Sequence, residues 1–495
     1  MKITGSFLAA RVLGLALLFA LLGAPRSEGR AYKPNIILML ADDFGYGSIN
    51  AYGAPEKYVK TPNLDALVNE GVKFTQAYTS GSVCTPTRYG IVTGEYSWRG
   101  ALKTGVVNNS DGLIIDPDTE TVASFLRKQG YQTAIVGKWH LGYTAEKQFE
   151  NLLGTIKPGP NDVGFNYQFA VPNNLDDLHK VWIENDHIYG LRSDKIEAYG
   201  KSSYGRPYIG YDAPQRVCVE VMSECTQRSI DWIDSLPKDT PFFLYHAFPA
   251  VHNPISPSDA MKGKSGCGDY GDFIQDVDLE VGNLVAALKQ RGLDENTLII
   301  FTADNGGDLP KRDAPAKTAY DKGFEFNGEN RGDKHLIYNG GSHVPFIVNW
   351  PAKVKPKGEC DALVCTVDIF GTLAHLVTGD EIAAQDGARD SVSFLPLIAK
   401  PTGPETRANF ISRDVAGRKY VRFGDWKYID NQFPKSRNDP ETLITKGQPE
   451  LYNIAKDPME EKNLFKSNPE MAEQGVSLLQ KIIEADSSRA LSRTR

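Results

Sequence analysis

Residues 35–45, NIILMLADDFG, decide the fold of this chain. The first six form an unbroken apolar run, which predicts a strand buried on both faces, as in a parallel sheet. A second run, TLIIFT at residues 297–302, continues into ADNG in the same way. Shorter apolar runs at residues 133–136, 241–245 and 345–348 predict further parallel strands of the same kind. Helical patterns followed by a glycine lie at 63–70, 119–129 and 273–290. Strands that alternate with helices predict an α/β fold with a large, mostly parallel sheet between helices.

The chain changes character after about residue 400. Two short β-type runs, at 420–423 and 426–429, are separated only by the dipeptide Gly-Asp, which predicts a β-hairpin. A helical pattern follows at 471–486. We therefore expect a large α/β domain at residues 31–400 and a smaller C-terminal α+β domain at residues 401–495.

The first 30 residues predict a secretory signal peptide. Lys2 and Arg11 precede an apolar run at residues 12–22, and small residues follow it. The run is shorter than the roughly 20 apolar residues that a membrane-spanning helix needs. We expect residues 1–30 to be removed and the mature protein to be secreted or periplasmic, through bacterial export, or lysosomal or extracellular in a eukaryote, without stable membrane insertion. An uncleaved anchor is the alternative.

Charge and cysteine content exclude several classes of protein. The 495 residues carry a formal net charge of -7, and loss of residues 1–30, with four cations and one anion, would bring it to -10. An acidic chain does not attract nucleic acid through its overall field, so an anionic ligand has to be held locally by a few cations. Six cysteines are too few for a disulfide scaffold.

Oxygen ligands follow both of the clearest strands. Asp42 and Asp43 come after the first strand, and Asp304 and Asn305 come after the second. Because the carboxyl ends of parallel strands lie at one edge of a sheet, these side chains can converge. Carboxylate and amide oxygens suit Ca²⁺, with Mg²⁺ as the second candidate. For any single Asp-Gly or Asn-Gly pair, a simple turn is the alternative.

The loop at residues 80–90, SGSVCTPTRYG, carries the sharpest motif. Cys84 is followed at fixed offsets by Pro86, Thr87 and Arg88. This arrangement resembles the signature of the type I, formylglycine-dependent sulfatases, and the chain is most similar to their arylsulfatase-A-like members. The resemblance implies an alkaline-phosphatase-like fold with residues 31–400 as the catalytic domain. It also implies that a formylglycine-generating enzyme converts Cys84 to Cα-formylglycine, or 3-oxoalanine.

The resemblance extends along nearly the whole mature chain. Further similar segments are residues 61–65, 137–142, 251–254, 331–341 and 450–464. The metal ligands that the resemblance implies are Asp42, Asp43, Asp304, Asn305 and the modified Cys84. The catalytic residues that it implies are Cys84, Arg88, Lys138, His140, His252 and Lys334.

These residue types suit the hydrolysis of a sulfate ester. The cations beside the metal ion, which would stabilise the sulfuryl oxygens, are Arg88, Lys138 and Lys334. A helix N-terminus after Cys84 would add backbone N–H donors. One hydroxyl of the hydrated formylglycine would attack sulfur, and the other would later expel sulfate. By the resemblance, His140 takes or steadies the diol proton, and His252, together with Lys334, protonates the leaving oxygen.

Sulfated glycans are the expected substrates, with small aryl sulfates as surrogates. Asn174 is either a contact to the sulfate or a turn residue. Two other functions stay open. One is a formylglycine-dependent phosphonate or phosphate ester hydrolase, and the other is an inactive sulfated-glycan binding protein, if Cys84 is not matured.

Some positions depart from the family pattern. His343 stands where an Arg is usual, and Asn339 where a Glu is usual. Because Arg and neutral His differ in charge and geometry, we expect a different contact at the rim of the pocket. Conversion of Cys84 would leave five cysteines, so at most two disulfides could form. The closely spaced pairs are Cys218 with Cys225 and Cys360 with Cys365.

Overall fold

The computed structural model describes residues 33–145, 152–311, 313–354, 358–383 and 386–494. The predicted signal peptide, residues 1–30, lies outside these ranges. By their contacts, residues Asn35–Arg495 form one compact unit, so the predicted domain boundary near residue 400 stays a prediction. Within the described ranges, every helix is too short or too polar to span a bilayer.

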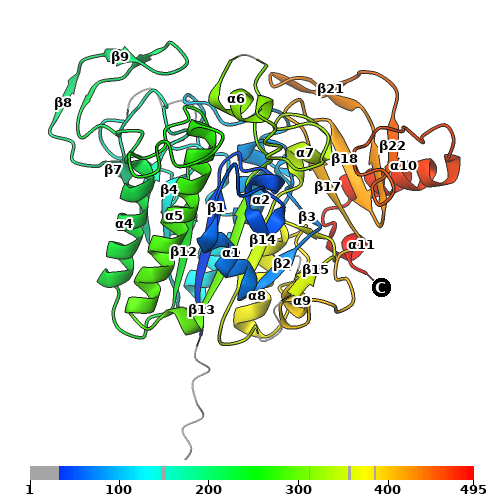
Figure 1. Ribbon diagram of the computed structural model, residues 1–495, viewed down its shortest axis with the longest axis horizontal. Coiled ribbons are helices and arrows are strands. Elements are labelled where there is room, and N and C mark those ends of the chain that lie inside the picture. Colours follow the sequence, from blue (N-terminus) through cyan, green and yellow to red (C-terminus); the bar gives the residue numbers. More distant parts are fainter. Residues whose placement is uncertain (1–32, 146–151, 312, 355–357, 384–385, 495) are drawn as a thin grey trace, which may run out of the picture. The chain divides into compact units, whose positions relative to one another are not determined.

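Five neighbouring strands run parallel at the centre of the largest sheet (Figure 1). β1 (Asn35–Ala41) lies between β13 (Thr297–Ala303) and β12 (Phe242–Ala247), and β4 (Gln132–Lys138) and β5 (Tyr167–Val171) continue the sheet beyond β12. β1 is buried along its whole length, as its apolar run predicts. Among the described residues the full strand order is β15-β2-β14-β13-β1-β12-β4-β5-β6-β7. The predicted α/β fold with a mostly parallel sheet is confirmed.

One of the outer strands, β14, runs in a direction that was not predicted. They are β2 (Val72–Phe74), β6 (Ile183–Glu184), β7 (His187–Ile188), β14 (Phe346–Asn349) and β15 (Gly358–Cys360). The apolar run at 345–348 forms a strand, but β14 runs antiparallel to both β13 and β2. A parallel return would need a crossover to the opposite end of the sheet. Instead, the chain after β13 stays at the carboxyl edge of the sheet and enters β14 from there.

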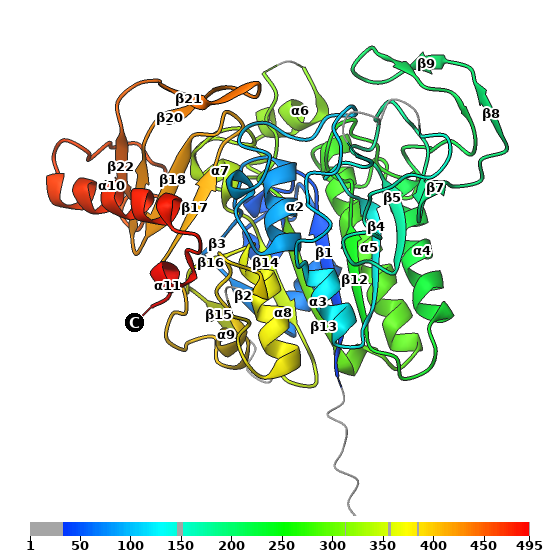
Figure 2. The same ribbon diagram turned by 180° about the vertical axis from the view of Figure 1, so that it is seen from behind.

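Helices cover both faces of this sheet (Figure 2). On one face lie α1 (Pro62–Asn69), α4 (Val221–Ser235) and α5 (Asp269–Gln290), and on the other lie α2 (Cys84–Thr93), α3 (Val122–Lys128) and α8 (Asp368–Thr378). Side chains alternate along a strand. Ile37 and Met39 of β1 therefore join the core under α1, α4 and α5. Ile36 and Leu38 join the core under α2, α3 and α8.

Local sequence signals set the helix ends. The hydroxyl of Thr121 accepts a hydrogen bond from the backbone N–H of Ser124 at 3.0 Å, and the Ser124 hydroxyl accepts one from the Thr121 N–H at 2.9 Å, which is a capping box before α3. Pro62 occupies the first position of α1. The predicted helices at 63–70, 119–129, 273–290 and 471–486 correspond to α1, α3, α5 and α10 (Pro469–Glu484), with ends shifted by at most four residues.

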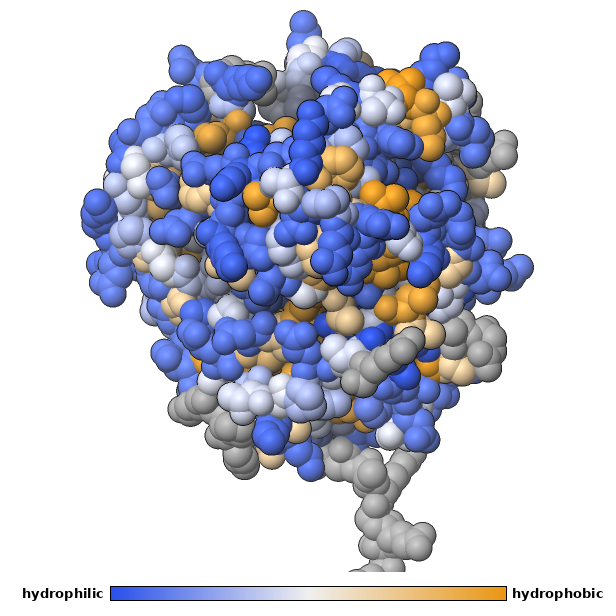
Figure 3. All heavy atoms as spheres, turned by 90° about the vertical axis from the view of Figure 1, so that its right-hand side faces the viewer, coloured by the Kyte–Doolittle hydropathy of each residue, from blue (hydrophilic) through white to orange (hydrophobic). Residues whose placement is uncertain are grey.

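A second sheet follows in the C-terminal part. Its antiparallel strands are β17 (Asn409–Arg413), β18 (Lys419–Phe423), β19 (Trp426–Ile429) and β22 (Glu450–Asn453), in that order. β18 and β19 form the predicted hairpin, and α10 packs against both. The Ser82 N–H donates to the Arg413 carbonyl oxygen at 2.9 Å, which ties this sheet to the chain just before α2. Figure 3 shows the side of the molecule that carries α10, where hydrophilic residues surround separate apolar groups.

Shorter elements complete the description. Their bounds are β3 (Ala77–Tyr78), β8 (Ser193–Ile196), β9 (Tyr199–Lys201), β10 (Pro207–Tyr208), β11 (Tyr211–Asp212), α6 (Pro315–Asp321), α7 (Asn339–Ser342), β16 (Val364–Cys365), α9 (Leu395–Ala399), β20 (Gln432–Ser436), β21 (Asp439–Thr445) and α11 (Arg489–Ser492). In both ribbon views, β8 and β9 on one side and β20 and β21 on the other lie beyond the carboxyl ends of the central strands (Figures 1 and 2). These segments border the edge at which the polar strand ends meet.

Neither of the closely spaced cysteine pairs forms a disulfide. All six cysteines lie in the described part of the chain, and each is free. The Cys218 sulfur instead lies 3.0 Å from Lys180 Nζ, while Cys225, a residue of α4, is buried in the core. Cys360 and Cys365 belong to strands of two different sheets. Close spacing in sequence therefore did not bring either pair of sulfur atoms into bonding geometry.

Candidate active site

The ends of β1 and β13 bring the predicted oxygen ligands together. The Asp43 N–H donates to Asp304 Oδ1 at 3.1 Å, and Asn305 Nδ2 donates to Asp43 Oδ1 at 2.8 Å. One oxygen each from Asp42, Asp43 and Asp304, together with the sulfur of Cys84, lie within 4.8 Å of one another. All of these side chains are buried. Three carboxylates packed this closely away from water need neighbouring cations.

Unpaired oxygens in this cluster fit a hard cation. Asp42 Oδ1 and Asn305 Oδ1 are buried, and among the described residues neither has a hydrogen-bond partner. Asn305 uses its Nδ2 for Asp43 and for the carbonyl oxygen of Gly306, so its Oδ1 is left to face the cluster. Burial, followed by the charge of Asp42, raises the pKa of Asp304 to about 6. A donor set of oxygen atoms with this excess of negative charge suits Ca²⁺ or Mg²⁺.

Cys84 is the first residue of α2 and lies against this cluster. Its sulfur accepts a hydrogen bond from Lys138 Nζ at 3.4 Å. Burial raises the pKa of the Cys84 thiol well above its ordinary value, so the unmodified side chain is neutral and a poor nucleophile. The predicted helix is present, and Cys84 itself is its first residue.

Arg88 joins α2 to the strand ends. Its Nε and Nη2 lie 2.9 and 2.8 Å from Asp304 Oδ2, and its Nη1 donates to the Lys138 carbonyl oxygen at 2.7 Å. Burial disfavours the charged guanidinium, but the charge of Asp304 raises the pKa of Arg88 above its usual value. A fully buried, fixed guanidinium therefore lies one turn from Cys84.

Two lysines neutralise the first pair of carboxylates. Lys138 Nζ lies 2.5 Å from Asp42 Oδ2, and Lys334 Nζ lies 2.6 Å from Asp43 Oδ2. Burial opposes ionisation of Asp43, but Lys334 lowers the pKa of that carboxyl below its usual range, while Asp43 raises the pKa of Lys334. Gly137 precedes Lys138 with a φ of 101°, and a Cβ there would lie 2.0 Å from the Ala247 carbonyl oxygen, so only glycine fits.

His140 presents one free nitrogen. Its Nε2 lies 3.0 Å from the Val107 carbonyl oxygen, which can only accept, so Nε2 carries the hydrogen and Nδ1 is an acceptor. Nδ1 is buried and has no partner among the described residues. Burial, with the charges of Lys138 and Arg88, lowers the pKa of His140 well below its usual range. The backbone at His140 has a φ of 56°, a conformation that surrounding contacts have to maintain.

His252 lies on another chain segment, which follows β12. Its Nδ1 donates to the Asn253 carbonyl oxygen at 2.7 Å, and its Nε2 lies 3.8 Å from Asp43 Oδ2. Burial and the charge of Lys334 lower the pKa of His252 to about 3. His252, Lys334 and Asp43 thus form one group, with Lys334 as its charged cation. The structure brings Cys84, Arg88, Lys138, His252, Lys334 and the four strand-end residues into one cluster. His140, two residues after Lys138, lies near enough for the charges of Lys138 and Arg88 to act on its imidazole.

The two departures from the family pattern have structural partners. His343 stacks on Tyr46 and Tyr78, with ring centroids 4.0 and 4.7 Å away, and its Nε2 lies 2.9 Å from the Thr75 carbonyl oxygen. The Asn339 N–H donates to Glu460 Oε2 at 2.7 Å. Both residues therefore hold the chain that follows Lys334 in place.

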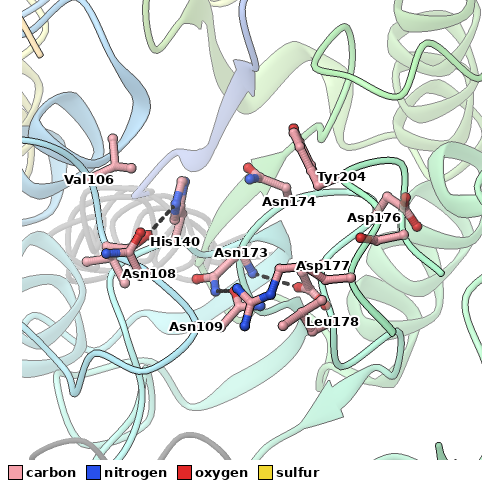
Figure 4. Close-up of a pocket in the computed structure, with 13 residues that line it drawn as sticks. Val106, Asn108, Asn109, His140, Asn173, Asn174, Asp176, Asp177, Leu178 and Tyr204 are labelled. Carbon is pink, nitrogen blue, oxygen red and sulfur yellow. Dashed lines mark hydrogen bonds between the residues drawn. The ribbon is translucent and has the colours of Figure 1, made fainter. Parts of the chain in front are cut away.

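A cavity opens beside His140 (Figure 4). Its volume is about 250 Å³, and its wall includes Asn108, Asn173, Asn174 and Tyr204. Of these, the sequence pointed only to Asn174. Asn108 lies far in sequence from Asn173 and Tyr204, and the tertiary structure alone brings these residues to one cavity.

Comparison with known proteins identifies the family. Residues 34–379 match the sulfatase family model, and residues 328–488 match the model of the C-terminal part of N-sulphoglucosamine sulphohydrolase. The chain belongs to the sulfatase family. The sulfatase is 34% identical to N-acetylgalactosamine-6-O-sulfatase of Bacteroides thetaiotaomicron, over 91% of this chain and 93% of the relative. It is 30% identical to human arylsulfatase A, over 90% and 87% of the two chains. The predicted family and the arylsulfatase-A-like character are confirmed.

Solved structures agree with this assignment. A structure from the glycosaminoglycan metabolism of Bacteroides thetaiotaomicron superimposes with a TM-score of 0.82 at 32% identity, over 91% of the sulfatase and 99% of that chain. The phosphonate monoester hydrolase of Agrobacterium radiobacter, at 19% identity and a TM-score of 0.57, shares the fold. The sulfatase is a hydrolase of sulfate esters with an alkaline-phosphatase-like fold, as predicted.

Proposed function

We propose that this sulfatase hydrolyses sulfate esters on glycans by means of a formylglycine formed from Cys84 and a bound Ca²⁺. One observation carries the proposal. The Cys84 sulfur lies within 4.8 Å of oxygens from Asp42, Asp43 and Asp304. In the same cluster, Asp42 Oδ1 and Asn305 Oδ1 have no hydrogen-bond partner among the described residues. A buried, neutral thiol is not activated as a nucleophile in that environment. An oxygen nucleophile beside a cation and three basic side chains would be activated.

Each chain residue then has a defined task. The bound cation would act as a Lewis acid toward the sulfuryl oxygens. The hydrate of the Cys84 formylglycine supplies a geminal diol, of which one hydroxyl attacks sulfur and the other later expels sulfate. The side chains that would hold the transferred group by charge are Arg88, Lys138 and Lys334. They are already fixed by hydrogen bonds, so little reorganisation is needed when the substrate binds.

The two histidines would move the protons. His140 is neutral, and its Nδ1 has a free lone pair, which suits a base for the diol proton. His252 Nε2 faces the charged pair formed by Lys334 and Asp43, so this group would deliver a proton to the leaving oxygen.

The relatives support a glycan substrate. One relative, which this chain matches over 93% of the relative's length, is an N-acetylgalactosamine-6-O-sulfatase. We therefore take 6-O-sulfated N-acetylgalactosamine as the first substrate to test, with aryl sulfates as surrogates. The protein would need a formylglycine-generating enzyme as its maturation partner. We further propose removal of residues 1–30 and export, with a catalytic domain at 31–400 and a C-terminal domain at 401–495.

Two measurements test this function. Intact-peptide mass spectrometry of the Cys84 peptide, from protein made in its native host, is expected to show the mass of formylglycine. Sulfate release from the 6-O-sulfated sugar is expected for the wild type and not for Cys84→Ala. An unmodified thiol would exclude the mechanism. A higher kcat/KM for phosphate or phosphonate esters than for sulfate esters would favour the phosphonate hydrolase alternative, whose fold this chain shares.

A further inference from the structure

The C-terminal segment at residues 450–464 resembles a family signature but lies outside the catalytic cluster. It contacts the loop at residues 331–340 instead, and this loop carries Lys334. The two ends of the loop meet through a hydrogen bond from the Gly340 N–H to the Arg331 carbonyl oxygen at 2.8 Å. Because the contacts reach both ends, the C-terminal segment can act on Lys334 through the loop.

Lys334 depends on the loop for its position. Its Nζ lies 2.6 Å from Asp43 Oδ2, and the residue is 5% exposed. The two residues that follow it, His335 and Leu336, are exposed to solvent, so this side of the loop has little packing. A lysine side chain is flexible, and a shift of about 1 Å at a catalytic group can lower a rate by about 10²-fold. The anchors at the ends of the loop therefore decide where the ammonium lies.

Glu460 anchors the C-terminal end of the loop. Its Oε2 accepts a hydrogen bond from the Asn339 N–H at 2.7 Å, and its Oε1 lies 2.7 Å from Lys427 Nζ. Lys427 Nζ also donates to Asn339 Oδ1 at 3.0 Å. Glu460 and Lys427 are fully buried, so their charges compensate each other away from water. The backbone and the side chain of Asn339 are thus both bound, and α7, which begins at this residue, lies beside the C-terminal sheet in both ribbon views (Figures 1 and 2).

Arg331 anchors the N-terminal end of the loop. Its guanidinium donates to the Glu460 carbonyl oxygen and, at 3.4 Å, to the Tyr452 hydroxyl, and it stacks on the Tyr338 ring with Cζ 3.7 Å from the centroid. The hydroxyls of Tyr452 and Tyr338 donate to the same atom, Glu450 Oε2, at 2.6 and 3.3 Å. Both ends of the loop thus contact one set of side chains. These are Lys427, Glu450, Tyr452 and Glu460, here called the C-terminal clamp.

The strand register explains why clamp residues face the loop. Lys427 of β19 lies opposite Tyr452 of β22, so the two side chains leave the sheet on the same face. Tyr428, the next residue of β19, leaves it on the other face, toward α10. There Gly475 lets the helix approach so closely that an added Cβ would lie 2.6 Å from the Tyr428 side chain. One face of the sheet therefore serves the loop and the other serves the core under α10.

We propose that the C-terminal clamp holds the Lys334 ammonium in its catalytic position. This inference rests on the proposed function, in which Lys334 holds the sulfate by charge and, together with His252, protonates the leaving oxygen. The clamp residues are positioning residues, because they act through Lys334. The segment that resembles the C-terminal signature thereby gains a task in catalysis, although it lies outside the cluster.

The test uses the full-length, matured enzyme and two aryl sulfates. Phenolate leaves less readily than 4-nitrophenolate, so phenyl sulfate depends more on a proton donor than 4-nitrophenyl sulfate does. Arg331→Gln removes the anchor at the N-terminal end of the loop. We expect it to lower kcat about tenfold for phenyl sulfate and about threefold for 4-nitrophenyl sulfate, with little change in KM. Tyr452→Phe, which removes a single hydroxyl, should shift kcat in the same direction by about two- to fivefold.

A double-mutant cycle shows whether the clamp acts through Lys334. In Lys334→Ala the ammonium is already absent, so the addition of Arg331→Gln should lower kcat for 4-nitrophenyl sulfate no further. Independent effects would multiply instead. Tyr428→Phe, on the α10 face of the same sheet, is the matched control and should leave kcat for both esters unchanged. The melting temperature of each variant reports whether the fold is intact.

The outcomes separate this inference from the proposed function. If the wild type cleaves neither ester, or if Lys334→Ala is as active as the wild type, the proposed function of the site is wrong and the inference falls with it. If Lys334→Ala is impaired but Arg331→Gln and Tyr452→Phe are fully active, only the clamp is refuted. Losses that multiply in the double mutant, or an equal loss for the two esters, would also overturn it, because the clamp would then support the fold rather than Lys334.

Discussion

The hydroxyl of Thr85 donates to the backbone carbonyl oxygen of His140 at 3.1 Å. The same hydroxyl oxygen accepts a hydrogen bond from the Val107 N–H at 3.1 Å, and the Val107 carbonyl oxygen binds His140 Nε2. Thr85 is the variable position of the cysteine motif, yet it ties the helix that carries Cys84 to both chain segments around His140. It is a positioning residue for the imidazole.

Removal of this hydroxyl should therefore impair catalysis. Thr85→Val keeps the shape but leaves the His140 carbonyl and the Val107 N–H without their partner, so we expect kcat to fall by about 10- to 100-fold through misplacement of the imidazole. Thr85→Ser restores the hydroxyl and should recover most of the activity. The measurement is kcat on an aryl sulfate, with the melting temperature recorded for both variants. If Ser and Val variants were equally impaired, the role would be packing alone.

Arg88 should not be replaceable by lysine. Its guanidinium contacts Asp304 through two nitrogens and the Lys138 carbonyl oxygen through the third, and a lysine ammonium cannot reach all of these groups. We expect Arg88→Lys to lower kcat/KM by about 10²- to 10³-fold, the usual loss for one electrostatic stabiliser. Arg291→Lys, at a surface pair with Asp234, is the control and should retain full activity. Comparable losses in the two variants would argue against a specific role.

Removal of divalent cations should destabilise the folded protein. Three buried carboxylates converge where Asp42 Oδ1 has no hydrogen-bond partner among the described residues, so a cation that binds there only in the folded state raises stability. At 100 times its dissociation constant such a cation contributes about 2.7 kcal/mol. We expect EGTA to lower the melting temperature of the wild type and Ca²⁺ to restore it. Asp42→Asn should blunt the response to Ca²⁺, and a melting temperature indifferent to EGTA in the wild type would contradict the site.

His343 should make stability depend on pH. Burial lowers its pKa to about 4, against about 6.5 in the unfolded chain. Between these two pKa values, His343 binds more protons in the unfolded state than in the folded state. Its contribution to the free energy of unfolding is therefore complete above pH 6.5 and is lost as pH falls toward 4. The loss amounts to at most about 3 kcal/mol.

Denaturant unfolding at pH 7.5 and pH 5 measures this effect. Because other buried groups also titrate in this range, the wild type is compared with His343→Gln at each pH. The free energy of unfolding of the wild type should fall more steeply with acidification than that of the variant. Parallel pH profiles of the two proteins would show that His343 does not contribute.

Much of the site was predictable because its residues follow local patterns. Asp42 and Asp304 come directly after continuous apolar runs, and the carboxyl ends of parallel strands meet at one edge whatever the rest of the chain does. Cys84 and Arg88 are one helical turn apart, so their relation also depends on local geometry. Other features depend on long-range packing. The direction of β14 was predicted wrongly because the path of a connection is not encoded in the strand it enters.

The α/β fold, the oxygen-bearing strand ends and the cysteine motif could be predicted from local sequence, since periodicity, strand-end residues and motif spacing act over a few residues. Only the tertiary structure decided which nitrogen of His140 is free, that the cysteines stay unpaired, and that Asn173, Asn174 and Tyr204 share a cavity. These facts depend on contacts between segments up to about a hundred residues apart. Such contacts arise when burial of the shared core brings the segments together, and no local pattern records them.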